Sequence, residues 1–161
     1  MSKFTQSQQW VSGQFVADFL DDLFGARGWA ITPTLPHEER VLCLGDRHYR
    51  RDGAHYTVEY KSGLQTARTG NVFLETISVD SVNKPGWVYT CQADYIFYAA
   101  LLNGMIVVFR PGTLRAKIEE LKAQFGVRQT THRQNVGYNT HGVVVPLHYA
   151  VAHLASGIIH V

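Results

Sequence analysis

The dipeptide Asp52-Gly53 constrains the fold of this chain most strongly, because it predicts a tight hairpin turn. A two-residue type I′ turn needs a positive φ at both central positions, and Asp-Gly is one of the pairs that adopt it. A reversal at these two residues pairs the strand before them with the strand after them, so that Asp46 faces Glu59. Because strand side chains alternate between faces, Lys61 shares a face with Glu59.

The predicted pairing puts two negative charges in an unfavourable position. Carboxylates directly opposite each other on neighbouring strands have Cβ atoms about 5 Å apart and repel. A divalent metal ion between Asp46 and Glu59, with Lys61 beside it, is the simplest way to offset that repulsion. The alternative is a solvated strand face, on which Glu59 and Lys61 form a surface ion pair worth about 0–1 kcal/mol. That alternative leaves the position of Asp46 unexplained, so we favour the metal site.

Composition bounds the class of protein. With 161 residues, 45% hydrophobic and 17% charged residues, the chain is expected to fold as a single domain, residues 1–161. The formal charge of +2 disfavours a protein that imitates nucleic acid. Between residues 47 and 68, however, basic residues exceed acidic ones, which suits an anionic partner such as a phosphodiester backbone.

The order of predicted elements indicates an α/β fold. An amphipathic helix is expected from about Ser7 to Ala26, and a second helix at 111–125. Further predictions are the hairpin strands Arg40–Arg51 and Ala54–Ser62, strands at Asn71–Val79, Tyr95–Leu102, Met105–Phe109 and Gly142–Leu147, and a short helix at His148–Ile159. This order predicts a mixed β-sheet of about five strands flanked by helices.

Location is predicted from what the sequence lacks. The first residues are polar, and no apolar run approaches the ~20 residues that a membrane helix needs. The two cysteines, Cys43 and Cys91, have no CxxC spacing, so neither a zinc site nor a disulfide framework is expected. We therefore expect a cytoplasmic protein with no membrane partner.

Asp46 followed by Glu59-Tyr60-Lys61 resembles the signature of the PD-(D/E)xK nuclease superfamily, an acidic residue on one strand and an acidic-x-Lys triplet on the next. The spacing is similar to that of archaeal Holliday-junction resolvases. The segments Thr69–Glu75, Pro85–Trp87 and Ala93–Tyr95 look like small phage-encoded nucleases. The resemblance covers about residues 10 to 125 and implies a restriction-endonuclease-like fold, in the host cytoplasm if the chain is phage-encoded.

The resemblance implies an Mg²⁺-dependent DNA endonuclease, for which Mn²⁺ is expected to substitute. Asp46 and Glu59 would hold the ion, the Tyr60 carbonyl would add a ligand, and Lys61 would act on the attacking water or on the phosphate. Glu75 is either a second metal ligand, a partner of a nearby cation, or an outward-facing side chain.

Two positions depart from the family pattern. Gly45 stands where the superfamily's name has a proline. Many members also carry a glutamate on the first helix; here Asp18 or Gln14 is the nearest candidate.

The expected partner is DNA. Contacts to its backbone are predicted for Arg47, Arg50, Arg51, His55, Arg68 and Lys84. Branched DNA is the first substrate expected, and symmetric cutting of both strands would favour a homodimer. A non-specific nuclease and a non-catalytic nucleic-acid-binding module of the same fold remain open, as does the role of residues 126–161.

Overall fold

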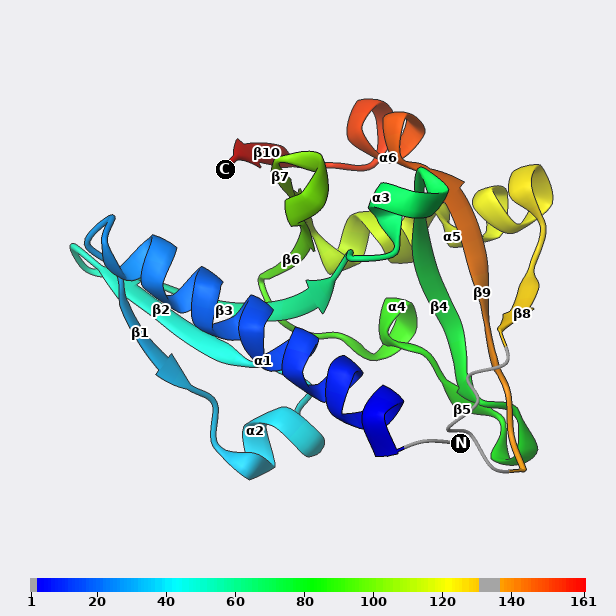
Figure 1. The fold of residues 1–161 in the computed structure, drawn as a ribbon, viewed down its shortest axis with the longest axis horizontal. Coiled ribbons are helices and arrows are strands. Elements are labelled where there is room, and N and C mark those ends of the chain that lie inside the picture. Colours follow the sequence, from blue (N-terminus) through cyan, green and yellow to red (C-terminus); the bar gives the residue numbers. More distant parts are fainter. Residues whose placement is uncertain (1–2, 131–136) are drawn as a thin grey trace.

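The protein is an α/β structure with one six-stranded and one four-stranded β-sheet (Figure 1). This computed structural model describes the backbone of residues 3–130 and 137–161, and the side chains of residues 13–130 and 137–161. Part of the predicted polar connection Gln129–Thr140, residues 131–136, therefore lies outside the described residues. The mixed α/β class predicted from the sequence is confirmed.

The six-stranded sheet has the order β1-β2-β3-β6-β7-β10. Its strands are β1 (Ala30–Pro33), β2 (Arg47–Arg51), β3 (Ala54–Ser62), β6 (Tyr95–Ala100), β7 (Met105–Phe109) and β10 (Gly157–His160). β3 and β6 run parallel, and the other neighbouring pairs are antiparallel. A parallel pair needs a long crossover connection, and here that connection contains two of the four strands of the second sheet.

The four-stranded sheet has the order β5-β4-β9-β8. Its strands are β5 (Lys84–Pro85), β4 (Asn71–Val79), β9 (Thr140–Pro146) and β8 (Arg128–Thr130). The predicted mixed sheet is present but has six strands rather than about five, and the second sheet was not predicted. Helix α3 (Thr66–Thr69) ends at Gly70 with φ 69°, and the strand that follows it, β4, pairs with β9 instead of with a strand of the first sheet.

Most predicted helices are present with small changes of boundary. The helices are α1 (Lys3–Gly25), α2 (Pro36–Arg40), α3, α4 (Trp87–Thr90), α5 (Pro111–Phe125) and α6 (Leu147–His153), with 3-10 turns η1 (Asp80–Val82) and η2 (Leu101–Asn103). Within the described backbone, no helix is long and apolar enough to cross a membrane.

Two predicted boundaries were wrong. The predicted helix His148–Ile159 stops at His153, because Ile158 and Ile159 pair with the edge of β7, where β-branched residues fit well. The strand expected from Arg40 begins only at Arg47, because Pro36 opens the short helix α2 instead.

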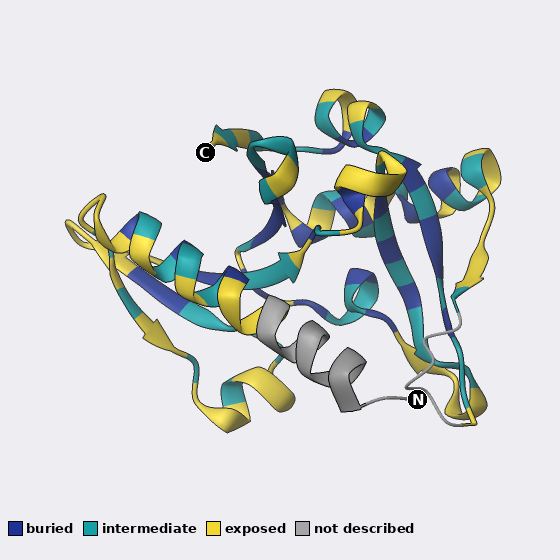
Figure 2. Cartoon of the chain, viewed as in Figure 1, coloured by how far each residue is buried: buried dark blue, intermediate teal, exposed yellow. Residues whose placement is uncertain are grey.

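The six-stranded sheet has hydrophobic side chains on both faces. Helix α1 packs on one face, called here the α1 face, through a core that includes Leu20, Phe24, Tyr49 and Phe97. The opposite face joins a larger core that contains side chains of β4, β9 and α5. In Figure 2, β4 and β9 carry many buried residues, whereas the tip of the β2–β3 hairpin is exposed.

The carboxylate of Asp80 ties η1 to the start of β9. It accepts hydrogen bonds from the Asn139 main-chain N–H (2.8 Å) and side-chain amide (3.1 Å), and it lies 3.1 Å from the His141 ring. The main-chain bond from Asn139 is the largest of the causes that lower the pKa of Asp80 to about 2. A carboxyl with a lowered pKa stabilises the fold above its unfolded pKa of about 3.9, and this stabilisation is lost as the pH falls.

Asp80→Asn is therefore expected to lower the free energy of unfolding at neutral pH. The deficit should narrow as the pH falls from about 4 toward 2, because the wild-type carboxyl becomes protonated there and resembles the amide. Urea unfolding of both proteins over this range measures it. Asp22→Asn, at an exposed position of α1, is the matched control and should leave stability nearly unchanged. A deficit independent of pH would contradict the interpretation.

Candidate active site

The predicted hairpin turn is confirmed, and so is the predicted register from Arg47 to Arg51. The paired register ends at Arg47, so the predicted pairing of Asp46 with Glu59 is not part of it; the main chain of Asp46 bonds Val58 instead. Asp52 and Gly53 have φ values of 51° and 81°, as a type I′ turn requires. β2 and β3 pair from Arg47 opposite Val58 to Arg51 opposite Ala54. Alternation along β3 then points Val58 to the α1 face and Glu59 to the opposite face.

Asp46 lies one residue before β2 and is held against β3 by two hydrogen bonds. Its main-chain N–H donates to the Val58 carbonyl (2.9 Å), so that two successive residues, Asp46 and Arg47, contact Val58 as in a β-bulge. Its carboxylate accepts a bond from the Tyr60 N–H (2.7 Å). The carboxylate is thereby fixed beside β3 at the residue between Glu59 and Lys61.

Gly45 allows this close approach. Its φ is 88°, and a Cβ at this position would lie 2.7 Å from the Val58 carbonyl oxygen and 2.8 Å from the Glu59 nitrogen. Both atoms belong to the main chain of β3 and cannot move aside as a side chain can. The glycine found where the superfamily's name has a proline therefore has a steric role in this chain.

Gly45→Ala is expected to destabilise the protein by at least about 2 kcal/mol, because it adds a main-chain collision to the strain of a positive φ. Gly53→Ala is the matched control: its φ is 81°, but no atom lies within 4 Å of the added Cβ. Chemical denaturation of both variants measures the difference. Equal losses of stability would show that the approach to Val58 imposes no steric limit.

Glu59 and Lys61 form a close ion pair on the face opposite α1. The Lys61 Nζ lies 2.6 Å from Glu59 Oε1, with 27% of the lysine side chain and 18% of the glutamate side chain exposed. Burial raises the pKa of Glu59, and the negative charge of Asp46 adds to the rise, while Lys61 opposes it. Burial alone would lower the pKa of Lys61, but Glu59, Asp46 and Glu75 together raise it. The lysine therefore remains an ammonium.

Glu75 of β4 and Trp87, the first residue of α4, lie near the same site. The charge of Glu75 acts on Lys61, whose Nζ lies 5.6 Å from the centre of the Trp87 ring. Gly86 brings these groups together, because any Cβ there would collide with the main chain of Glu75. The negative charge of Glu75 near Lys61 agrees with the role of a partner of a nearby cation, and a role as second metal ligand stays a prediction.

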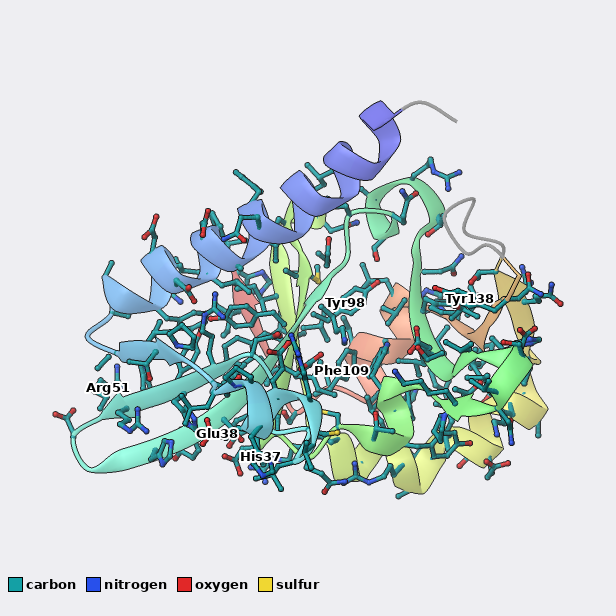
Figure 3. The ribbon with its side chains drawn as sticks, turned by 90° about the horizontal axis from the view of Figure 1, so that it is seen from below. His37, Glu38, Arg51, Tyr98, Phe109 and Tyr138 are labelled. Atoms are coloured by element: carbon teal, nitrogen blue, oxygen red, sulfur yellow. The ribbon has the colours of Figure 1, made fainter. Side chains whose placement is uncertain are left out.

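Two of the arginines predicted to contact DNA lie on the wrong face for this site. Arg47 forms an ion pair with Asp21 of α1 (3.0 Å). Arg51 lies 4.4 Å from the centre of the Trp29 ring, near the hairpin turn (Figure 3). Side chains alternate between faces along β2, so Arg47 and Arg51 lie on the same face as Tyr49, which packs in the α1 core.

The other predicted DNA contacts are all exposed, and two of them, Arg50 and His55, lie on the face of Glu59. Arg50 is exposed on the face of Glu59, where its guanidinium donates to the Thr32 hydroxyl (3.2 Å). His55 is exposed on the same face and bonds His48 (2.9 Å). Arg68 in α3 donates to Gln65, and Lys84 in β5 is exposed.

The two residues of the first helix considered as an additional ligand, Gln14 and Asp18, do not lie on the face of Glu59. Gln14 and Asp18 are exposed and bond each other at 2.8 Å, and α1 packs on the face away from Glu59. Asp21 is the helix carboxylate that reaches the sheet, where the Tyr60 hydroxyl donates to it (2.8 Å). Sequence periodicity could not find this contact, because it gives no information on polar partners far away in the chain.

The sequence analysis also did not predict a hydrogen-bonded row of three side chains, Glu38, His48 and His55. Glu38 of α2 lies 3.0 Å from the His48 ring, whose other nitrogen bonds His55. Alternation along the hairpin places both histidines on the face of Glu59, but nothing in the sequence pattern identifies Glu38 as their partner.

The carboxylates of Asp46 and Glu59 are oxygen ligands of the kind that a hard divalent metal ion prefers. Among the described residues, no group of three or more His, Cys, Asp or Glu side chains is arranged to hold a metal. Mg²⁺ is commonly bound by only one or two carboxylates, with water and substrate phosphate completing its shell. Asp46 and Glu59 provide the two carboxylates of such a site. Their negative charges repel each other, so a bound cation would be stabilised there.

Comparison of the chain with protein-family models, with curated proteins and with solved structures finds no match.

Proposed function

We propose that this chain is a metal-dependent DNA endonuclease with a restriction-endonuclease-like fold. The observation that carries the proposal is the meeting of Asp46, Glu59 and Lys61 at the open end of the β2–β3 hairpin, in the order that the superfamily signature requires. A surface ion pair would not need Asp46 pinned to the β3 main chain, nor a mostly enclosed lysine.

Asp46 and Glu59 would hold Mg²⁺ or Mn²⁺. An extended residue points its N–H and C=O to the same strand edge, so the Tyr60 carbonyl faces the edge at which Asp46 bonds its N–H. It is therefore the natural third oxygen ligand. When bound, the ion would polarise the phosphoryl oxygen and lower the pKa of its water.

Lys61 would act as a positive charge rather than as a base. Its ion pair with Glu59 (2.6 Å) holds the ammonium beside the two proposed metal ligands, where it can stabilise charge that develops on the phosphate. The nearby Trp87 ring and Glu59 restrict its position, which reduces the reorganisation needed during the reaction. Glu75 supports this role by adding negative charge near the lysine.

Branched DNA is the first substrate proposed, because the spacing of Asp46 and Glu59 is similar to that of Holliday-junction resolvases. A homodimer is the form that would cut both strands. Arg50, His55, Arg68 and Lys84 are the proposed contacts to its backbone. Arg47 and Arg51 leave this group because they are engaged on the α1 face.

The test is a cleavage assay of the purified chain on linear duplex, single-stranded and four-way DNA, in Mg²⁺ and in EDTA. Cutting that requires the metal supports the proposal, and the preferred substrate separates a junction enzyme from a non-specific nuclease. DNA binding with no cutting, and with no calorimetric uptake of Mn²⁺ that depends on Glu59, would favour the non-catalytic module.

A further inference from the structure

A cleft of about 510 Å³, lined by apolar and aromatic surface with several polar side chains, lies next to the candidate active site. It is bounded by the end of β3, by α3, by the first half of β4 and by β8. Its lining includes Gln65, Asn71, Phe73, Tyr98, Arg128 and Gln129. The volume is in the range of pockets that hold small organic ligands.

The sheet geometry joins this cleft to the site. Tyr98 pairs with Lys61 on the neighbouring strand, so their main chains are about 4.8 Å apart and their side chains share a face. Phe73 lies two residues before Glu75 on the same face of β4. Tyr98 lies in the interior of the molecule (Figure 3), where its hydroxyl bonds Thr66 (2.9 Å).

Three paired residues on neighbouring strands of the four-stranded sheet, Glu75, Gly142 and Arg128, surround the Phe73 ring. Glu75 pairs with Gly142 of β9, and Gly142 pairs with Arg128 of β8. Any Cβ on Gly142 would collide with the Phe73 ring, so the ring lies over the glycine between Glu75 and Arg128. This arrangement puts an aromatic surface between the acidic site and an exposed cation.

The chemistry of the cleft suits one ligand class. Among the described residues that line it, none is a carboxylate. Arg128 lies in the wall, and Arg68 is held at Gln65 by bonds of 3.2 and 3.0 Å, so two guanidinium groups flank the space. Side-chain amides offer both donors and acceptors, which base edges can pair with.

We propose that this cleft holds one unpaired nucleotide of a single DNA strand, with its base against Phe73 and its flanking phosphates near Arg68 and Arg128. This inference rests on the proposed function, since it places the nucleotide beside the phosphate to be cut. Paired bases hide their flat faces within the stack, whereas unpaired bases stack readily on aromatic side chains. The substrate class is therefore a strand with unpaired nucleotides, such as a flap or a junction, rather than intact duplex.

Binding in EDTA tests the cleft without cleavage. Fluorescence anisotropy with a short labelled oligothymidylate and with a duplex should show tighter binding of the single strand. Arg128→Gln and Phe73→Leu are each expected to weaken single-strand binding by about fivefold or more, with little change for duplex. Arg27→Gln, an exposed arginine after α1 on the far face, is the matched control. Circular dichroism checks that each variant folds.

A parallel cleavage assay separates the two proposals. If Lys61→Met abolishes cutting while Arg128→Gln and Phe73→Leu bind the single strand as wild type does, the cleft proposal is overturned and the proposed function stands. If the wild-type chain cuts no DNA in Mg²⁺, but its single-strand preference requires Arg128 and Phe73, the proposed function fails and the nucleotide site stands. Equal binding of single strand and duplex by the wild type also overturns the cleft.

Discussion

Lys61→Met is expected to lower the rate of DNA cleavage by about 10²- to 10³-fold, the usual cost of removing one group that stabilises charge in the transition state. The variant keeps the length of the side chain but removes the ammonium that lies 2.6 Å from Glu59. Binding of DNA should change much less, because one charge is lost from a larger basic surface.

Single-turnover cleavage in Mg²⁺, with DNA affinity measured separately, tests the Lys61 prediction. Lys117→Met, on α5, is the matched control and should cleave at the wild-type rate. Removing Lys61 leaves the enclosed carboxyl of Glu59 without its cation, so folding must be checked by circular dichroism. A Lys61→Met protein that is folded and fully active would refute the assigned role.

Asp46→Asn is expected to lower both Mn²⁺ affinity and cleavage by at least about 100-fold. Changes to groups that only support a metal ligand already cost about 10- to 100-fold, and a direct ligand should cost at least as much. The amide oxygen of Asn can still accept the bond from the Tyr60 N–H, so the hairpin should keep its geometry. The loss would then reflect charge rather than structure.

Calorimetric titration of Mn²⁺ and the cleavage assay together measure the Asp46 effect. Asp52→Asn is the control within the same hairpin, because Asp52 is exposed and Asn also tolerates its φ of 51°. Wild-type metal uptake by a folded Asp46→Asn protein would remove Asp46 from the ligand set. Unchanged uptake with lost cleavage would assign Asp46 to another role in the reaction.

The sequence predicted the part of the site that depends on local geometry. Asp52-Gly53 specifies its own turn, and a turn fixes the register of the two strands that it joins, so Glu59 and Lys61 could be assigned to one face. The DNA contacts were predicted less well. Arg47 and Arg51 were grouped by their charge, although alternation puts both on the face away from Glu59.

Long-range partners could not be read from the chain. The second sheet exists because β4 pairs with β9, about 70 positions further along, and no local pattern encodes that choice. The position of Glu75 near Lys61 and the cleft beside Phe73 both follow from this pairing. The contact of Asp21 with Tyr60 has the same origin, since it joins a helix to a strand across the α1 core.

By itself, the sequence determined the α/β class, the hairpin and the order of acid, acid and lysine on it, because turn chemistry and strand alternation act over a few residues. Only the tertiary structure decided that the chain divides into two sheets, that Glu75 and Trp87 join Lys61, and that a cleft borders the site. Those features depend on hydrogen bonding and packing between distant segments, for which the free energy is gained only when the whole chain is folded.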